Sequence, residues 1–214
     1  MDSNTAFLIY SRLNDRYPHT ETSFLHFQDP FQCMILTILS AQTTDAAVNK
    51  VAPPLFARFP TPESLAGADL EEVEGIIRRT GFYHAKARHI TGAARAVVER
   101  FGGRVPATMD ELLTIPGVGR KTANIVLNHA FGIDEGIAVD THVRRLAQRI
   151  GFSDSANPDR IEQDLIGLFP KSHWGGITYL LIRHGREVCP ARKPQCGTCV
   201  LRDLCRSALL QEEG

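Results

Sequence analysis

The stretch at residues 113–123, LTIPGVGRKTA, has the composition of a tight turn between two helices. Glycines adopt backbone angles that other residues avoid, and Val118 between them can anchor the turn in the core. The N–H groups of the turn and of the helix that starts near Arg120 would then point outward together, which suits a phosphate. The pattern predicts a helix-hairpin-helix motif that binds a nucleic-acid backbone through Gly117, Val118, Gly119 and Arg120. An ordinary turn between helices is the alternative.

Lys121 follows this turn directly and lies in the first turn of the expected helix. A cation there opposes the helix dipole, so it is unfavourable for stability and indicates another role. An amine attacks an electrophile only when it is neutral, and burial together with the positive end of a helix disfavours the ammonium form. We therefore expect Lys121 to be a nucleophile activated by its burial and by the helix.

The segment IAVDTHVRR at residues 137–145 places an aspartate in front of a further helix. Aspartate is a preferred N-cap, and Asp140 fits that structural role. A capping carboxylate is also held rigidly, and near a reacting sugar it would stabilise an oxocarbenium-like state or assist proton transfer. His142, Arg144 and Arg145 lie in the first turns of this helix, where they contact either a phosphate or only solvent. The sequence leaves both interpretations open.

Four of the five cysteines gather near the C-terminus: Cys189, Cys196, Cys199 and Cys205. Four thiolates this close indicate a four-coordinate metal or cluster site. Zinc ribbons generally use two CxxC pairs far apart, and only one CxxC is present, so the uneven spacing favours a [4Fe–4S] cluster over zinc. The loop between the first two ligands holds Arg192 and Lys193, an exposed basic pair suited to phosphate contact.

The elements that must position these groups are helices, because helical periodicity runs through nearly the whole chain and period-2 alternation is scarce. Caps mark three helix starts: Thr61-Pro62, a capping box from Thr108 to Glu111, and Asn157-Pro158. The apolar run at 31–41 predicts a helix in which Cys33 is a core residue. Pro53 and Pro54 are expected to kink or divide the helix at 45–59.

The basic and acidic side chains are equal in number but unevenly distributed along the sequence. The 214 residues carry 24 basic and 24 acidic side chains, so net charge gives no argument for nucleic acid. Residues 183–206, however, hold six basic and two acidic side chains, and residues 61–80 hold five acidic and two basic ones. The basic segment includes the cysteine loop, as expected if one face meets DNA. The chain has no apolar run of 18 residues and no signal-peptide pattern, so we expect an intracellular protein without a membrane partner.

These features, in this order, resemble the endonuclease III family of DNA repair enzymes. Five motifs carry the resemblance: LSAQTTDAAVNK (39–50), GFYHAKA (81–87), IPGVGRKTANIVLNHAFG (115–132), VDTHVRRL (139–146) and HGREVCPARKPQCGTCVLRDLC (184–205). The resemblance implies an all-α, two-lobed helical DNA glycosylase fold with a helix-hairpin-helix motif and a C-terminal [4Fe–4S] cluster loop. Residues 23–135 would form a six-helix barrel-like domain with the hairpin, and residues 1–22 with 136–214 the iron–sulfur domain.

The resemblance also implies a bifunctional DNA glycosylase and AP lyase of base excision repair. Lys121 would attack the sugar C1′ and expel an oxidised or damaged pyrimidine such as thymine glycol, Asp140 would assist, and elimination from the Schiff base would nick the strand. The four cysteines would bind the cluster. The partner would be duplex DNA with damaged bases or abasic sites, bound by a cytoplasmic monomer that associates with the nucleoid in a bacterium or archaeon.

Three further DNA contacts are implied by the resemblance. Gln42 would fill the gap left by a flipped base, although a polar helix-end cap is the alternative. Phe82 stands where leucine is expected and would lie near the opposing strand. Lys86, with His84, would touch the DNA backbone or lie on a solvated face.

Two other functions remain as alternatives. A mismatch-specific monofunctional glycosylase would act without an amine nucleophile, and Lys121 argues against it. A non-catalytic helix-hairpin-helix DNA-binding protein would need neither Lys121 nor Asp140.

Overall fold

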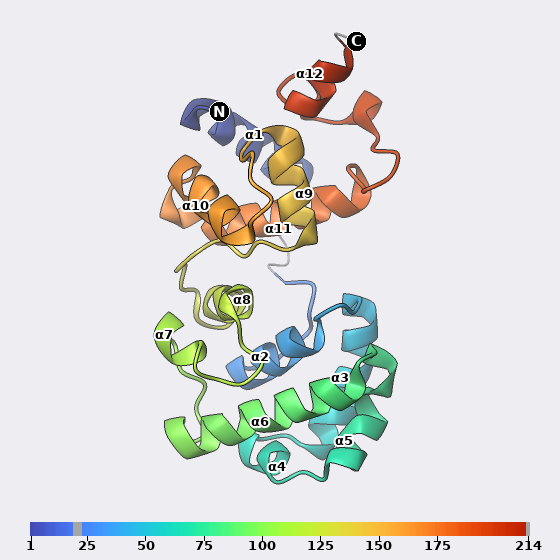
Figure 1. Ribbon diagram of the computed structural model, residues 1–214, viewed down its shortest axis with the longest axis vertical. Coiled ribbons are helices and arrows are strands. Elements are labelled where there is room, and N and C mark those ends of the chain that lie inside the picture. The colour runs from blue at the N-terminus through green and yellow to red at the C-terminus, as the bar shows by residue number, and fades with distance from the viewer. Residues whose placement is uncertain (19–22, 213–214) are drawn as a thin grey trace. The chain divides into compact units, whose positions relative to one another are not determined.

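The computed structural model describes residues 1–18 and 23–212, with side chains through Leu210. These residues form helices, turns and loops, with no strand among them (Figure 1), which confirms the all-α prediction. The α-helices are α1 (Ser3–Arg16), α2 (Pro30–Leu39), α3 (Asp45–Arg58), α4 (Pro62–Ala66), α5 (Leu70–Ile77), α6 (Tyr83–Phe101), α7 (Met109–Leu112), α8 (Arg120–Phe131), α9 (Thr141–Ile150), α10 (Pro158–Leu168), α11 (Trp174–Glu187) and α12 (Arg206–Glu212). Short 3-10 helices are η1 (Arg78–Thr80), η2 (Lys171–His173) and η3 (Cys196–Thr198). No helix of the described residues is long and apolar enough to cross a membrane.

Backbone contacts divide the chain into two compact units. One contains Met1–Thr22 and Gly136–Gly214, and the other contains Ser23–Glu135. Each unit has its own cluster of buried apolar side chains. The two units are referred to below as the terminal unit and the central unit.

Helix α2 lies at the centre of the central unit. Every residue from Cys33 to Leu39 is buried, and α2 packs against α3, α6 and α8. A helix that is apolar all round is stable only when neighbours cover it on several sides. Cys33 is one of these core residues, as expected, and burial raises the pKa of its thiol to about 12.

The proline pair in α3 does not divide that helix, contrary to one of the expected outcomes. Pro53 and Pro54 lie inside α3, which continues to Arg58. Each proline removes a backbone hydrogen bond, a loss of about 3 kcal/mol in a helix interior. Val48 and Leu55, on either side of the pair, are buried in the core, and this packing offsets the loss.

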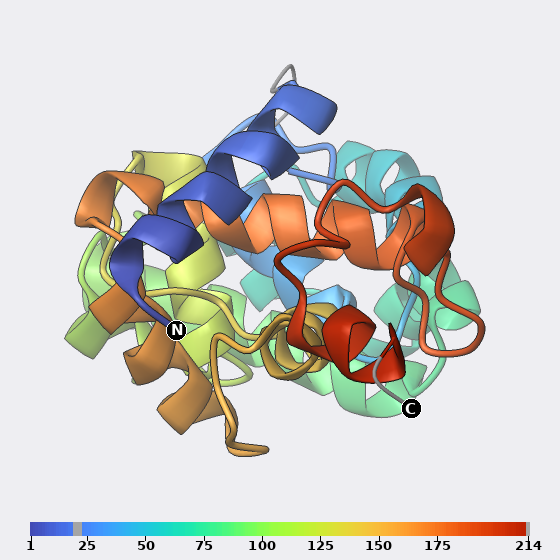
Figure 2. The same ribbon diagram turned by 90° about the horizontal axis from the view of Figure 1, so that it is seen from above.

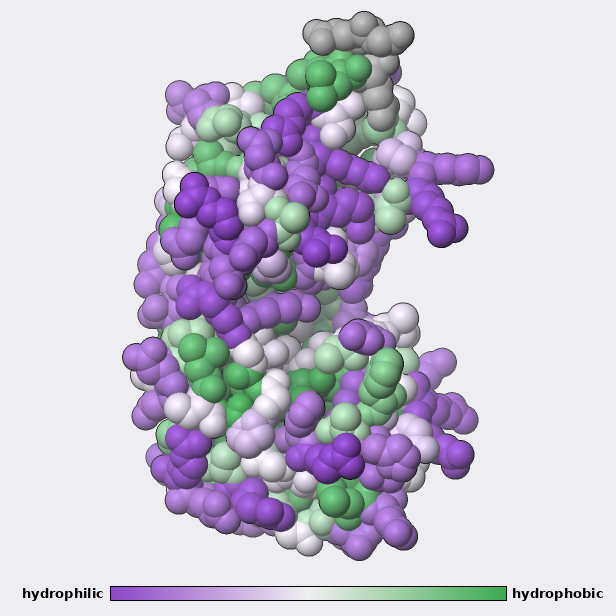
Figure 3. All heavy atoms as spheres, viewed as in Figure 1, coloured by the Kyte–Doolittle hydropathy of each residue, from purple (hydrophilic) through white to green (hydrophobic). Residues whose placement is uncertain are grey.

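The terminal unit joins the two ends of the sequence. Helix α1 packs on α10 and α11 through Ile9 and Leu13, both fully buried (Figure 2). Helix α9 presents Val143 and Ile150 to the same core, as its periodicity predicts. In the part of the surface in Figure 3 that belongs to the terminal unit, most side chains are hydrophilic, and apolar ones gather over α12.

Candidate functional site

The hairpin between α7 and α8 has the backbone that its glycines predict. Gly117 has a φ of +79°, in the left-handed region, and an added Cβ there would lie 3.1 Å from the Cβ of His89 on α6. Val118 is buried and anchors the turn, and its N–H donates to the carbonyl of Ile115 at 3.1 Å. Val118 therefore offers an external ligand neither its buried side chain nor a free N–H, and its role in binding would be to hold the turn. Gly119 has an ordinary extended backbone, but the space around its Cβ position is open to 4 Å.

The start of α8 offers backbone donors to a ligand. Gly119 is the N-cap of α8 and has no side chain to accept a hydrogen bond from the first turn. The first N–H groups of a helix lack partners within the helix, and the helix dipole favours an anion there. The hairpin can therefore hold a phosphate with its main chain.

Helix α7, which precedes the hairpin, has Thr108 as its N-cap, but Thr108 and Glu111 do not form the full capping box that the sequence predicts. The hydroxyl of Thr108 accepts from the N–H of Glu111 at 3.4 Å and donates to the Glu111 carboxylate at 2.6 Å. That carboxylate thus bonds to the Thr108 hydroxyl, where a capping box would use the Thr108 backbone N–H. Arg100 at the end of α6 donates to the carbonyl and hydroxyl of Thr114, which fixes the entry to the hairpin.

Lys121 lies in the first turn of α8, as predicted, but its expected burial is wrong. The side chain is exposed, because α8 turns Ala123, Val126 and Leu127 towards the core and the second residue of the helix away from it. Arg120 beside it is also exposed. Desolvation of the Lys121 amine would therefore have to come from a bound substrate.

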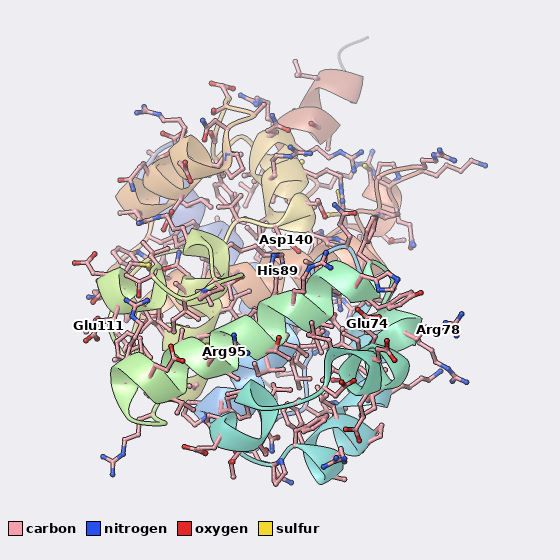
Figure 4. The ribbon with its side chains drawn as sticks, turned by 60° about the horizontal axis from the view of Figure 1, so that its bottom comes forward. Glu74, Arg78, His89, Arg95, Glu111 and Asp140 are labelled. Carbon is pink, nitrogen blue, oxygen red and sulfur yellow. The ribbon has the colours of Figure 1, made fainter. Side chains whose placement is uncertain are left out.

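Asp140, in the terminal unit, is the N-cap of α9 (Figure 4). One carboxylate oxygen, Oδ1, accepts from the N–H groups of His142 and Val143, each at 2.8 Å. The structural interpretation of Asp140 is thus confirmed, and it fixes the orientation of the carboxyl group. The second oxygen, Oδ2, is not used by the cap, so the same side chain can serve a substrate.

His142 and Arg144 differ in how they are placed for a phosphate. Arg144 is exposed on α9, whereas His142 is half-buried. Burial lowers the pKa of His142, with Arg145 and Arg186 acting in the same direction and Asp140 against them. Arg145 lies 3.1 Å from Nδ1 of His142, and a guanidinium only donates, so Nδ1 is the acceptor and Nε2 carries the hydrogen. In this arrangement Nε2 is the atom with which His142 can donate to a phosphate.

The four cysteines of the C-terminal segment line one small cavity of about 30 Å³ in the terminal unit. Each is partly buried, and none forms a disulfide. Within residues 1–18 and 23–212, no three His, Cys, Asp or Glu side chains converge closely enough for a single metal ion. A [4Fe–4S] cluster takes four thiolates at four separate irons, so four cysteines around a shared cavity fit that group.

Two arginines of α9 hold the cysteine loop, a role that could not be predicted from the sequence. Arg149 donates to Sγ of Cys189 at 3.2 Å and to the carbonyls of Pro190 and Ala191 at 2.8 and 2.9 Å. Arg145 donates to the Cys189 carbonyl at 3.0 Å. These contacts join residues about forty positions apart, so only the folded chain reveals them.

Three candidate DNA contacts share a strained backbone. Gln42, Phe82 and Lys193 have φ values of 53°, 48° and 54°, and they are the non-glycine residues with positive φ in the described chain. All three side chains are exposed, that of Phe82 to 70%. A non-glycine residue in this region costs about 1–3 kcal/mol and is typical of functional sites. Arg192, beside Lys193, is exposed as well.

Lys86 does not lie where either sequence interpretation placed it. Its side chain is only 4% exposed, and Nζ donates to the carbonyl of Thr80 at 2.9 Å and to the hydroxyl of Thr43. The expected contact of Lys86 with DNA is therefore corrected: the buried amine has partners within the protein. His84, two residues earlier in the first turn of α6, instead pairs with Glu74 at 2.7 Å.

Two family models match consecutive parts of the chain. The model described as HhH-GPD superfamily base excision DNA repair protein matches residues 35–171, well over half of the chain. The iron-sulfur binding domain of endonuclease III matches residues 187–205, which include all four clustered cysteines.

Similar proteins and a similar solved structure carry the name endonuclease III. Endonuclease III of Synechocystis sp. is 53% identical over 92% of this chain and 89% of its own length, and that of Escherichia coli K12 is 41% identical over 92% of each. A trapped endonuclease III–DNA covalent intermediate, in an estranged-adenine complex, has a TM-score of 0.93 at 38% identity and covers 99% of both chains. A thermostable thymine-DNA glycosylase, at a TM-score of 0.87 and 24% identity, shares the fold.

The helical fold with its hairpin and the cysteine loop therefore match the same family of proteins. These matches confirm the resemblance that the sequence showed. The chain is a member of the endonuclease III family: a base-excision DNA glycosylase with AP lyase activity that acts on DNA and carries a [4Fe–4S] cluster.

Proposed function

We propose that Lys121 is the covalent nucleophile of this glycosylase and lyase, that Asp140 assists it, and that the substrates are damaged pyrimidines of the thymine glycol type in duplex DNA. The observation that carries the proposal is the position of Lys121: its exposed amine lies two residues after the hairpin glycine that caps α8. A backbone held by the hairpin would bring a nucleotide to this amine. The trapped covalent complex of a relative at 38% identity supports the same chemistry.

The reaction needs one amine and one carboxylate. The neutral amine of Lys121 attacks C1′ of the damaged nucleotide, the bond from C1′ to the base breaks, and the base leaves with the bonding electrons and takes up a proton. The attached amine then gives up one proton, the C1′–O4′ bond of the sugar ring breaks, and O4′ takes up a proton, which leaves a protonated Schiff base between Lys121 and C1′. Removal of a proton from C2′ forms the double bond to C3′ and expels the 3′ phosphate. Water finally releases Lys121.

Asp140 suits the assisting role because its carboxylate is fixed. The cap holds Oδ1, so Oδ2 can face the positive charge that develops at C1′ or relay a proton at the sugar. Removal of this charge without change of shape, in Asp140→Asn, should slow base release by about a hundredfold or more.

The remaining candidate residues would bind DNA. The hairpin amides with Arg120, Arg144 on α9, and the pair Arg192 and Lys193 would neutralise phosphates. Gln42 and Phe82 would occupy the duplex where the damaged nucleotide is flipped out.

The four clustered cysteines would ligate the [4Fe–4S] cluster, which would supply a rigid anchor for the loop 190–195 that carries the basic pair. We propose further that the central and terminal units correspond to the barrel-like and iron–sulfur domains. The protein would act as a cytoplasmic monomer at the nucleoid.

Borohydride trapping tests the nucleophile. Borohydride reduces a Schiff base to a stable amine, so a thymine glycol duplex should become covalently attached to the wild type but not to Lys121→Gln. Lys50→Gln is the matched control, because Lys50 is an exposed lysine of the same unit on α3. Lys121→Gln should still bind a duplex with a tetrahydrofuran abasic analogue.

Each outcome has a definite meaning. Adduct formation by Lys121→Gln would show that another amine attacks. Release of free base by the wild type without any adduct would indicate a glycosylase that activates water, as in the monofunctional alternative.

A further inference from the structure

Gln42 and Phe82 lie in two loops that are far apart in the sequence. Gln42 belongs to the connection between α2 and α3, and Phe82 follows η1 as the N-cap of α6. Both residues are exposed and have the left-handed backbone described above. Exposed side chains offer little packing to offset backbone strain, so other contacts of the two loops must hold this conformation.

Lys86 connects these two loops from within the core of the central unit. Its Nζ donates to the carbonyl of Thr80 at 2.9 Å, two residues before Phe82, and to the hydroxyl of Thr43, next to Gln42. The Thr43 hydroxyl also donates to the Thr80 carbonyl at 2.5 Å. The Thr80 carbonyl, the Thr43 hydroxyl and the Lys86 amine are thus joined to one another by three hydrogen bonds, and we call these three groups the node between the loops.

The backbone of Lys86 strengthens the same connection. Its N–H donates to the carbonyl of Phe82 at 3.1 Å, so Lys86 binds the carbonyls on both sides of Gly81. Gly81 has a φ of 66° and a ψ of 159°, a conformation essentially confined to glycine. Lys86 therefore fixes the turn that delivers Phe82 as well as the loop that delivers Gln42.

We propose that Lys86 is a positioning residue that locks the Gln42 and Phe82 loops together, so that both side chains enter the gap of a flipped nucleotide as one preformed unit. The proposal rests on the proposed function, because that function assigns Gln42 and Phe82 to the gap. Lys86 itself touches no DNA.

The choice of a lysine supports this role. Burial alone lowers the pKa of Lys86, so the site pays for desolvating an amine where an apolar side chain of similar length would pack without that cost. An amine supplies several donors on one flexible stem, which lets it reach acceptors on two loops at once. A buried amine that costs desolvation free energy but bonds to both loops fits a residue whose role is to hold the two loops in one arrangement.

Contacts on the outer side hold the Phe82 turn as well. His84 and Glu74 form the 2.7 Å pair between α6 and α5, and the ring of Tyr83 contacts that of His84 in a tilted arrangement, with 4.2 Å between the ring centroids. The guanidinium of Arg78 lies 5.9 Å above the Tyr83 ring. Figure 4 places Glu74 and Arg78 beside the N-terminal end of α6. The turn is thus held from both sides, and Lys86, together with the Thr43 hydroxyl, also joins it to the Gln42 loop.

The variant Lys86→Met removes the donors and retains the apolar stem. Thr91→Val is the matched control: Thr91 is buried on the same helix, but its hydroxyl bonds only within α6, to Ala87 at 2.9 Å and Arg88 at 3.3 Å. The first measurement is the fluorescence of 2-aminopurine opposite a tetrahydrofuran analogue, which rises when the opposing base is unstacked. The second is single-turnover excision of thymine glycol from duplex DNA. The third is borohydride trapping on an abasic site in single-stranded DNA, where no gap exists.

The expected pattern is selective. Lys86→Met should lose the 2-aminopurine signal and excise from duplex DNA about tenfold to a hundredfold more slowly, since small displacements of positioning groups have effects of that size. Trapping on single-stranded DNA should stay within about twofold of wild type, and Thr91→Val should behave as wild type throughout. In a Gln42→Ala, Phe82→Ala background the loss caused by Lys86→Met should largely disappear, because coupled residues are not additive.

A second pair of variants covers the case in which Lys86→Met does not fold. Thr43→Val breaks the node, whereas Thr43→Ser keeps the hydroxyl and should retain wild-type signal and duplex activity. Normal 2-aminopurine fluorescence and duplex excision in folded Lys86→Met or Thr43→Val would overturn the proposal. An equal loss on single-stranded DNA would overturn it too, because that result indicates a general structural role. Failure of the wild type to trap on either substrate would instead refute the proposed function.

Discussion

Gly117 and Gly119 flank one buried valine, yet the structure gives them different physical roles, and alanine substitution separates the two. Gly117 needs a left-handed backbone, with φ at +79°, whereas Gly119 has an ordinary extended one, with φ at −95°. We expect Gly117→Ala to destabilise the fold and Gly119→Ala to weaken DNA binding without destabilising it.

The magnitude for Gly117→Ala follows from two costs. A left-handed backbone costs an L-residue about 1–2 kcal/mol. The new methyl group would also lie 3.1 Å from the Cβ of His89 and 3.4 Å from Cγ2 of Ile38. The Cβ of His89 is fixed to the backbone of α6 and cannot move by a change of rotamer, so the 3.1 Å contact adds about 1 kcal/mol or more of overpacking, whereas the distance to Ile38 is an ordinary van der Waals contact. The free energy of unfolding should therefore fall by about 2–4 kcal/mol.

For Gly119→Ala the stability terms nearly cancel. Alanine restricts the unfolded chain, which stabilises by about 0.4–1 kcal/mol, and it is a poorer N-cap than glycine by a similar amount. The methyl group points into open space in the free protein. In the complex that space is where a phosphate would approach the amides of α8, so the dissociation constant should rise about tenfold, as for the loss of one hydrogen bond to a charged group.

Urea unfolding and fluorescence anisotropy with a tetrahydrofuran-containing duplex measure the two effects. Gly102→Ala is a suitable control, because Gly102 also has a left-handed backbone, at φ 60°, but lies at the far end of α6 with open space around it. It should lose stability and keep DNA affinity. Unchanged affinity in Gly119→Ala would refute the close approach of DNA to this hairpin, and an unchanged urea midpoint in Gly117→Ala would refute the assigned turn.

Two further predictions concern a half-buried histidine, whose Nδ1 atom is buried without a hydrogen-bond partner among the described residues, and the cysteine loop. Burial lowers the pKa of His129 from 6.5 to about 4, so between these values the unfolded chain binds the proton and the folded chain does not. Stability should fall as the pH drops from about 6.5 to 4, by up to about 3 kcal/mol in total, and His129→Gln should flatten this part of the urea-midpoint profile; parallel profiles would contradict the assignment. Arg149→Met removes three hydrogen bonds to residues 189–191. The absorbance of the cluster at about 400 nm should therefore be lost faster in the presence of a chelator. The exposed Arg160→Met is its control, and equal rates in the two variants would show that Arg149 does not secure the loop.

Local signals accounted for most of the fold. The inner face of α9, with Val143 and Ile150 at helical spacing, and the N-cap at Asp140 depend on neighbours within one or two turns, so a single sequence displays them. The hairpin glycines belong to the same group, because the conformation they permit is a property of the residue itself.

Contacts between segments far apart in the chain could not be predicted from the sequence. Lys86 was interpreted as a surface cation, yet it occupies the buried face of α6, four residues before Ile90 and eleven before Val97. That spacing was a signal, but a lysine on an apolar stripe is informative only once its acceptors on Thr43 and Thr80 are known. Arg149 likewise has an ordinary helical position, and its partners lie forty residues away.

The error over Lys121 has a physical cause that bears on the mechanism. Residues in the first turn of a helix have free backbone N–H groups that need water or a ligand, so this part of α8 is exposed in the free protein. The same exposure lets DNA reach the amides and the amine together. A nucleophile buried in the free enzyme would be activated but inaccessible to a sugar within a duplex. If Lys121 is the nucleophile, as proposed, its exposed amine would be desolvated only when a nucleotide is flipped against it, which would couple its activation to the proposed opening of the duplex by Gln42 and Phe82.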